Sequence, residues 1–258
     1  RSMNVAIIGT KFMGKEHSNA WLNAPHFFDM GIRPVLKVAC GQDVAHLEAF
    51  AERWGWEETS TDWRDVVGRA DIDIVDIAVP TYLHREIAIA AAEAGKHIFC
   101  EKPFAISVAD ARAMYDAAAR AGIVHYLNHN YRRLPAIMLA KRLIDEGAIG
   151  RIFHWRGAYL QDWNVDPEFP LTWHLRKETA GAGPHADLNS HSIDLARFLI
   201  GDIKAVNAMM TTFVKERPLP GAGAAAFSAG SGAAAEMGPV TVDDASFVLA
   251  EFENGALG

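Results

Sequence analysis

The stretch IIGTKFMGKEH, Ile7–His17, decides which fold this sequence encodes. Gly9 and Gly14 have the spacing of the first and third glycines of G-x-G-x-x-G, the loop that holds a pyrophosphate between a strand and a helix. The first glycine permits the tight turn, and the third lets the helix pack closely on the strand. Lys11 replaces the middle glycine. We expect a dinucleotide site at this loop; a structural turn that binds nothing is the alternative.

Lys11 is compatible with a bound nucleotide. A left-handed backbone at this position would cost a lysine roughly 1 to 2 kcal/mol. A charge-assisted hydrogen bond to phosphate contributes about 1.5 to 3 kcal/mol, which equals or exceeds this backbone cost. We therefore expect a pyrophosphate loop whose lysine points its ammonium toward the phosphates or into solvent.

Apolar runs alternate with helical patterns through the first half of the chain. The expected strands are Asn4–Ile8, Val35–Cys40, Ile72–Val79, His97–Cys100 and Val124–Leu127. The expected helices are Lys15–Leu22, Val44–Trp54, Leu83–Ala94, Val108–Ala121 and Ala136–Glu146. This alternation predicts an α/β fold with a parallel sheet covered on both faces. We expect residues 3–130 to form a dinucleotide-binding Rossmann domain.

The pattern changes after residue 150, where strand patterns become longer. Strands are expected at Arg151–Leu160, Lys204–Lys215 and Val240–Glu253, with one helix at about Asp187–Leu199. Residues 131–258 should therefore form an α+β domain with an open, mostly antiparallel sheet. The low-complexity segment at 221–238 is expected to be a mobile surface loop.

The sequence ends shortly after a turn signal. Asn254-Gly255 is a typical hairpin pair, and only three residues follow it. A long strand left unpaired at a sheet edge is a hazard for aggregation. We therefore expect the chain to be incomplete at its C-terminal end.

Composition excludes several classes of partner. The chain has 258 residues, is 50% hydrophobic, carries a formal net charge of -7 and contains no Lys/Arg-rich run, so nucleic acid is not expected. No long apolar span or secretion signal is evident, which predicts a cytoplasmic protein without membrane contact. Cys40 and Cys100 each end an apolar run and are expected to be small buried residues. No metal site is expected.

Residues at strand ends should line the ligand cleft, because open parallel sheets bind ligands beyond the carboxyl ends of their strands. Pro80, Thr81 and His84 follow one strand, and Glu101 to Pro103 (EKP) follow the next. Lys102 then points toward the same side, although a plain surface lysine is the alternative.

The segment after the second strand bears on the choice of cofactor. Asp43 lies where an acid would bind the adenosine ribose, and no Arg or Lys lies within 41–48, which favours NAD over NADP. Asp43 could equally cap the next helix.

Asp187 and His191 are four residues apart on one expected helix, which would place a carboxylate and an imidazole on one face. Helix capping by Asp187 with a hydrogen-bonded His191 is the structural alternative.

Together, GTKFMG, PTYLH, EKP, NYRRLP and DLNSHSID resemble, in this order, the Gfo/Idh/MocA family of oxidoreductases. The resemblance covers nearly the whole chain. It implies a Rossmann domain that binds a nicotinamide cofactor, and a second domain whose open sheet carries the substrate site and the contacts of a homo-oligomer, a dimer or tetramer. Lys102, Asp187 and His191 match the family's catalytic trio.

The resemblance also implies two sets of binding residues. The cofactor set is Gly9, Lys11, Phe12, Met13, Gly14, Asp43, Pro80, Thr81, His84, Glu101, Lys102 and Asn130. The substrate set is Lys102, Tyr131, Arg132, Gln161, Trp163, Asn164, Trp173, Arg176, Asp187 and His191. The sequence departs from the family pattern at Lys11, at Gly41, where NAD-using members often carry the ribose-binding acid, and at Asn189.

The expected reaction is the reversible, NAD(P)-dependent oxidation of a secondary hydroxyl of a sugar, anhydrosugar or cyclitol. His191 would take the hydroxyl proton, since imidazole titrates near neutrality. Lys102 would donate a hydrogen bond to the oxygen, and Asp187 would anchor a neighbouring hydroxyl or orient the lysine. In the alternative assignment Lys102 is the base. Two other functions remain open: an NAD-dependent glycosidase that acts by transient oxidation and elimination, and a non-enzymatic NAD(H)-binding protein.

Overall fold

The computed structural model describes residues 1–220 and 236–258. Its contacts divide the chain into two compact units, residues 1–128 (the N-terminal unit) and 129–258 (the C-terminal unit). Most of the segment predicted to be a mobile loop lies outside the described residues. Within the described part of the chain, no helix has the length and apolar character needed to cross a bilayer.

The N-terminal unit is built on a six-stranded parallel sheet with the strand order β3-β2-β1-β4-β5-β6. The strands are β1 (Ser2–Ile8), β2 (Arg33–Cys40), β3 (Glu58–Ser60), β4 (Ile74–Ile77), β5 (His97–Cys100) and β6 (His125–Leu127). The helices are α1 (Phe12–Phe27), α2 (Val44–Trp54), α3 (Trp63–Gly68), α4 (His84–Glu93), α5 (Val108–Ala121) and the 3-10 turn η1 (Thr81–Leu83). The order reverses between β1 and β4, which is where dinucleotides bind in such sheets. The predicted Rossmann-like fold is confirmed.

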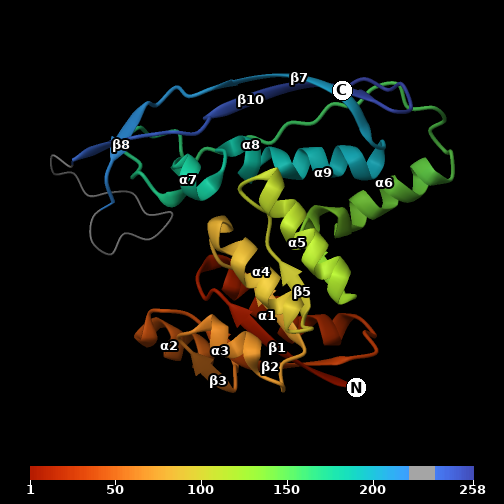
Figure 1. Cartoon of the computed structure of the whole chain (residues 1–258). Coiled ribbons are helices and arrows are strands. Elements are labelled where there is room, and N and C mark those ends of the chain that lie inside the picture. The colour runs from red at the N-terminus through yellow and green to blue at the C-terminus, as the bar shows by residue number, and fades with distance from the viewer. Residues whose placement is uncertain (221–235) are drawn as a thin grey trace. The chain divides into compact units, whose positions relative to one another are not determined.

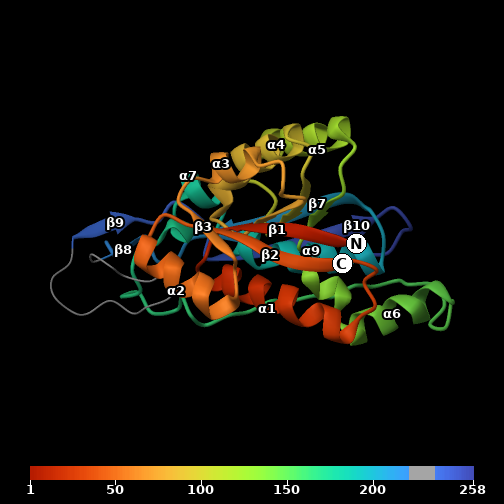
Figure 2. The ribbon, with the colours of Figure 1, turned by 90° about the horizontal axis from the view of Figure 1, so that it is seen from below.

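Alternating side chains of β1 bury both faces of this sheet. Val5 and Ile7 pack in the cluster that contains Leu47 of α2, whereas Ala6 and Ile8 pack in the cluster that contains residues of α3, α4 and α5. Figure 2 shows the same division, with α1 and α2 on one side of the sheet and α3, α4 and α5 on the other. Burial on both faces explains why the strands read as continuous apolar runs.

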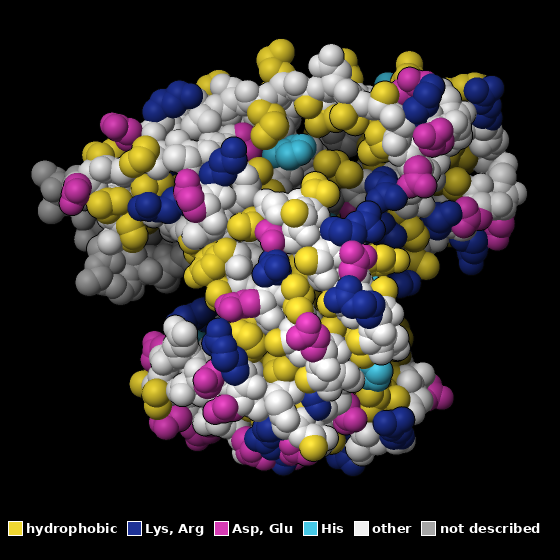
Figure 3. Space-filling view, in the orientation of Figure 1, with side chains coloured by type: hydrophobic (Ala, Val, Ile, Leu, Met, Phe, Trp, Pro, Cys, Tyr) yellow, Lys and Arg dark blue, Asp and Glu magenta, His cyan; other side chains and the backbone are white. Residues whose placement is uncertain are grey.

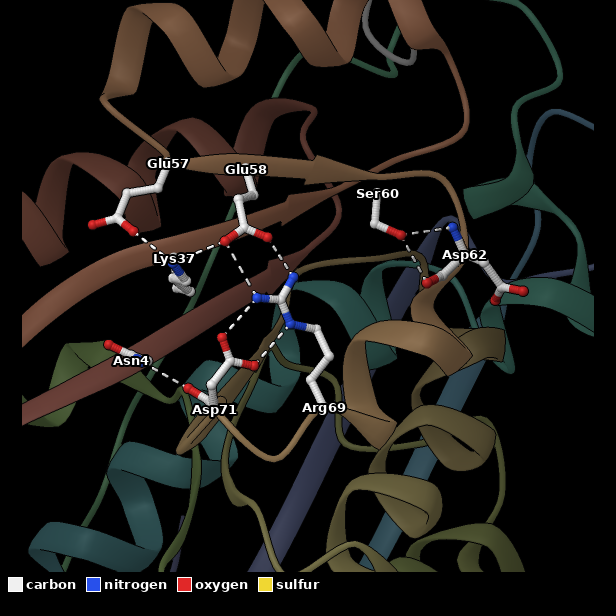
Figure 4. Close-up of polar contacts among 8 residues, drawn as sticks. All are labelled: Asn4, Lys37, Glu57, Glu58, Ser60, Asp62, Arg69 and Asp71. Atoms are coloured by element: carbon white, nitrogen blue, oxygen red, sulfur yellow. Dashed lines mark hydrogen bonds and ion pairs between the residues drawn. The ribbon is translucent and has the colours of Figure 1, made fainter.

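Strand β3 and helix α3 are absent from the sequence prediction. Glu58 in β3 is partly exposed and lies in a three-residue strand too short for a periodic signal. Ion pairs hold β3 in place: Lys37 contacts Glu57 and Glu58, and Arg69 contacts Glu58 and Asp71 (Figure 4). Hydrogen bonds from Arg69 lower the pKa of Glu58 and of Asp71 to about 2.

The C-terminal unit contains two small antiparallel sheets among its described residues. The predicted antiparallel pairing is therefore present, but it is divided between two two-stranded sheets. They pair β7 (Ile203–Thr211) with β10 (Ala245–Phe252) and β8 (Glu216–Pro218) with β9 (Met237–Pro239). The helices are α6 (Pro135–Asp145), α7 (Lys177–Ala180), α8 (Pro184–Asp187) and α9 (Asn189–Leu199), with the 3-10 turns η2 (Asn130–Arg133) and η3 (Trp173–Leu175). Helices α8 and α9 run along one face of the β7–β10 ribbon (Figure 1). At the Asn254-Gly255 turn, Phe252 N donates to Ala256 O, which closes a hairpin.

Two predictions for this unit are wrong. Arg151–Leu160 is not a strand, because only His154 forms a bridge, to Leu257, and the remaining residues of the segment have no ladder partner among the described residues. The single helix expected at Asp187–Leu199 is interrupted at Leu188, whose backbone ends α8 before α9 begins. Asp187 and His191 therefore lie on successive helices.

Candidate functional site

The glycine loop has no room for side chains at Gly9 or Gly14. Gly9 has φ +109°, and a Cβ on it would lie 2.4 Å from Ala78 O. A Cβ on Gly14 would lie 2.3 Å from Gly9 O, so the start of α1 packs directly on the end of β1. The first turn of α1 contains no acidic residue. These features fit a pyrophosphate, which helix N-termini bind through free amides and the helix dipole.

Lys11 is unstrained in this loop. Its φ is -80° and its ψ is -146°, so the left-handed conformation considered from the sequence does not arise. Its Nζ lies 3.9 Å from Asp43 Oδ2, and both side chains are largely exposed. The lysine and the aspartate thus form one exposed ion pair beside the loop.

Asp43 caps α2, which was the structural alternative for this residue. Its carboxylate accepts a hydrogen bond from His46 N at 3.2 Å. A Cβ on the neighbouring Gly41 would lie 3.0 Å from Thr10 Oγ1, so a larger side chain there would require the Thr10 side chain to shift by a few tenths of an ångström. Packing against Thr10 therefore gives a physical reason for a glycine at the position where an acid is often found.

His84 does not face a cleft, contrary to the sequence expectation. The residue is 1% exposed, with Nε2 2.9 Å from Val79 O and Nδ1 3.1 Å from Pro103 O. Burial lowers the pKa of His84. Thr81 is buried as well, whereas Pro80 is partly exposed. The imidazole ties the segment after β4 to the segment after β5.

Glu101 belongs to a buried polar cluster that sequence reasoning missed. His17 Nδ1 donates to Asp76 Oδ1 at 2.8 Å, and His17 Nε2 donates to Glu101 Oε1 at 3.0 Å. Trp21 Nε1 donates to Asp76 at 2.7 Å, and Asn128 Nδ2 donates to Glu101 at 2.6 Å. We call these five residues the His17 cluster. Its sequence signal was an acid inside one apolar strand and another at the end of the next.

The His17 cluster holds a charged imidazole. Burial alone would lower the pKa of His17, but the charge of Asp76 and hydrogen bonds to Asp76 and Glu101 outweigh it and raise the pKa to about 10. Burial alone would raise the pKa of Glu101, but the hydrogen bond and charge of His17, the hydrogen bond from Asn128 and the charge of Lys102 together outweigh it and lower the pKa of that carboxyl. Lys102 follows Glu101, is partly buried and precedes Pro103 through a cis peptide bond.

In the C-terminal unit, His191 is buried on α9 and packs among aromatic rings. Its ring stacks on Tyr131 with centroids 4.2 Å apart and an interplanar angle of 17°, and it meets the ring of His129 edge-on at 5.7 Å. The hydroxyls of Tyr131 and Tyr159 are 2.7 Å apart, and this hydrogen bond is the main reason that the pKa of Tyr131 rises to about 12. The nearby charge of Asp187 acts in the same direction.

A chain of hydrogen bonds extends from these tyrosines into a cavity. Gln161 Nε2 donates to the Tyr159 hydroxyl at 3.0 Å, and Trp163 Nε1 donates to Gln161 Oε1 at 2.7 Å. The cavity has a volume of about 1040 Å³. Its lining includes Tyr159, Gln161, Trp163, Asn164, His174 and Asp187. Several residues of the predicted substrate set therefore come together around one space.

Other members of that set lie differently. Arg132 forms a two-fold ion pair with Asp194 of α9, at 2.6 and 2.5 Å, and its guanidinium also lies over Phe198. Trp173 stacks on His174 with centroids 3.7 Å apart, and Arg176 is exposed. The Arg132 side chain is committed to holding η2 against α9.

Expectations from the sequence also concern the cysteines, the potential metal ligands and the charged surface residues. Cys40 and Cys100 are buried free thiols, as expected, and burial raises the pKa of Cys40 to about 12. Among the residues that the structure describes, no group of three His, Cys, Asp or Glu side chains is arranged to hold a metal ion. On the face drawn in Figure 3, acidic and basic side chains are interspersed over the N-terminal unit.

Comparison with known proteins decides the family. Residues 3–129 match the description "Oxidoreductase family, NAD-binding Rossmann fold", and residues 137–258 match the "GFO/IDH/MocA C-terminal domain". The chain belongs to the Gfo/Idh/MocA family. The resemblance seen in the sequence is thus confirmed.

Among Gfo/Idh/MocA relatives, levoglucosan dehydrogenase of Pseudarthrobacter phenanthrenivorans is 48% identical over 259 residues, which cover 100% of this chain and 66% of that protein. D-apiose dehydrogenase of Paraburkholderia graminis is 34% identical, over 79% of this chain and 51% of that protein. A levoglucosan dehydrogenase solved in complex with NADH and levoglucosan superposes with a TM-score of 0.92 at 47% identity, over 100% of this chain and 66% of that one. The chain thus spans less than two thirds of the length of these relatives.

Proposed function

We propose that the protein reversibly oxidises a secondary hydroxyl of a sugar, anhydrosugar or cyclitol with NAD as the hydride acceptor. The observation that carries the proposal is the 48% identity to levoglucosan dehydrogenase across the whole chain. Relatives named D-apiose dehydrogenase and D-xylose dehydrogenase support the same substrate class. We place substrate binding and homo-oligomer contacts, in a dimer or tetramer, in residues 131–258, and the enzyme in the cytoplasm.

The glycine loop would hold the cofactor. Gly9 and Gly14 let a pyrophosphate approach the backbone at the N-terminus of α1. The further proposed members of the cofactor set are Lys11, Phe12, Met13, Pro80, Thr81, Glu101, Lys102 and Asn130. The buried His84 supports the loops beside the site instead of facing the cofactor. When bound, the nicotinamide supplies the hydride acceptor. Asp43 favours NAD, because its exposed carboxylate would accept from a ribose hydroxyl and repel a 2′-phosphate.

The cavity beside Trp163 suits a polyol. Its aromatic rings offer apolar faces to C–H groups, while Gln161, Asn164 and Asp187 offer hydrogen-bonding atoms to hydroxyls. Trp173 and Arg176 remain proposed members of the substrate set. In this proposal Arg132 holds η2 against α9 through its ion pair with Asp194, and it does not need to contact the substrate directly.

We assign the proton transfer to His191. The stacking of its ring on Tyr131 fixes the imidazole plane, which a general base needs in order to aim one nitrogen at the hydroxyl proton. Lys102 donates a hydrogen bond to the oxygen as its proton leaves, and Asp187 anchors a neighbouring hydroxyl. The alternative is that Lys102 is the base. In that case the pH dependence of kcat will persist in His191→Ala and will be lost in Lys102→Met.

A reduction screen tests the function. The purified chain is mixed with NAD or NADP and a panel of monosaccharides, anhydrosugars, inositols and glycosides, and both NAD(P)H absorbance and the release of free sugar are followed. We expect NADH to form with at least one member. Hydrolysis of a glycoside without net NADH would identify the glycosidase, and cofactor binding without turnover on any member would identify the non-enzymatic binding protein; either result overturns the proposal.

A further inference from the structure

Two buried histidines hold the residues on either side of Lys102. On one side, His17 Nε2 donates to the carboxylate of Glu101 at 3.0 Å. On the other, His84 Nδ1 lies 3.1 Å from the carbonyl oxygen of Pro103. Lys102 is therefore carried by a turn that is tied down both before and after it.

His17 is itself fixed from a different strand. Its Nδ1 donates to Asp76 of β4, whose second carboxylate oxygen accepts from Trp21 at 2.7 Å. The imidazole thus connects Asp76 in β4 to Glu101, the residue that follows β5. The position of β4 therefore influences the orientation of the Glu101 side chain. Asn128 donates to the same Glu101 oxygen at 2.6 Å, so the carboxylate has two donors.

Burial of this cluster is a poor source of stability. Asp76 is 0% exposed, Glu101 is 4% exposed and His17 is 5% exposed, so two carboxylates and one imidazolium are all buried from solvent. Desolvation of buried ions often cancels their attraction, and well-packed apolar residues would stabilise the site as well or better. What the cluster provides is a single hydrogen-bonded geometry, with one net negative charge whose Glu101 carboxylate interacts electrostatically with Lys102.

We propose that His17 is a positioning residue for Lys102, acting through the carboxylate of Glu101. The proposal rests on the proposed function, in which Lys102 contacts the reacting oxygen. His17 orients Glu101, and the orientation of Glu101 sets where the Lys102 ammonium points. A displacement of about 1 Å at a reacting group can lower turnover by about 10²-fold, so a positioning residue acts on kcat.

A matched pair of variants separates positioning from general damage to the cluster. In His17→Asn the amide nitrogen replaces Nδ1 and retains the Asp76 contact, whereas in His17→Gln it replaces Nε2 and retains the Glu101 contact. Both variants remove the imidazolium. We expect His17→Asn to lower kcat by about 10- to 100-fold and His17→Gln by less than about 5-fold, with NAD affinity similar in both. Equal kcat values in the two variants would overturn the proposal.

A second readout needs no turnover. The acetylation rate of Lys102 in the cofactor-free chain, measured by mass spectrometry against that of exposed Lys15, should change in His17→Asn and remain near the wild-type rate in His17→Gln. If His17→Asn does not fold, Asn128→Ala removes the other donor to Glu101 and should change the same rate. An unchanged Lys102 rate in the folded variants refutes the positioning role. Retained activity in Lys102→Met would refute the role proposed for Lys102 at the reacting oxygen, and absence of turnover in the wild type on every sugar would refute the proposed function. The acetylation rates still test His17 in either case.

Discussion

The stability of the N-terminal unit should fall as pH rises from neutrality, because His17 is charged when buried. Its pKa is about 10 in the folded chain, against about 6.5 for an ordinary histidine in the unfolded chain. The difference makes protonation of His17 favour the folded chain by roughly 5 kcal/mol relative to the same cluster with a neutral imidazole; this is the pH-dependent part of the stability and does not measure the net effect of burying the cluster. Since the folded pKa is the raised one, this contribution is fully present below pH 6.5 and is lost as pH approaches 10, at up to about 1.4 kcal/mol per pH unit.

Urea unfolding of the chain between pH 6 and 10 measures this slope, with His17→Gln as the matched control. Buried Cys40, whose pKa is about 12, adds a decline of the same sign only above about pH 8.5, where thiols ionise in the unfolded chain. Between pH 6.5 and 8.5 the wild type should therefore lose stability while His17→Gln changes little. Parallel curves for the two proteins in this window would refute a charged His17.

Three further predictions concern single side chains. Gly9→Ala should abolish detectable NAD binding and destabilise the chain by about 1 to 3 kcal/mol, measured by calorimetry and urea unfolding, because φ is +109° and a backbone carbonyl occupies the space. Unaltered NAD affinity would contradict this. Asp43→Ser should keep the helix cap, release Lys11 and raise kcat/KM for NADP by about tenfold or more, and no gain would refute the discriminating role of the pair. Arg132→Met should lower the free energy of unfolding by about 1 to 3 kcal/mol, because it leaves a carboxylate unpaired; a change confined to KM would instead indicate direct substrate contact.

Much of the N-terminal unit could be predicted because its local signals agree with one another. Helix α2 begins and ends at the predicted residues, since Asp43 caps its start and Gly55 adopts φ +75° at its end. Helix α5 does the same between Ser107 and Gly122. Strand β3 escaped prediction because it depends on ion pairs between separate segments.

The candidate site was predictable only where a motif is local. The roles expected for Gly9 and Gly14 match the backbone geometry of the loop. The His17 cluster was missed because Asp76 and Glu101 are 59 and 84 residues away from His17 along the chain. The prediction of a strand at 151–160 was wrong because strand formation also depends on residues distant in the sequence. An alternating pattern does not show whether another segment pairs with it, and here only His154 forms a bridge.

Hydride transfer from a sugar carbon to NAD is the central claim. It is tested most directly by the mass of the NADH formed when the chain acts on a panel of sugars deuterated at carbon. The account predicts NADH that carries a deuterium taken from the substrate. Unlabelled NADH, or no NADH with any sugar of the panel, would contradict it.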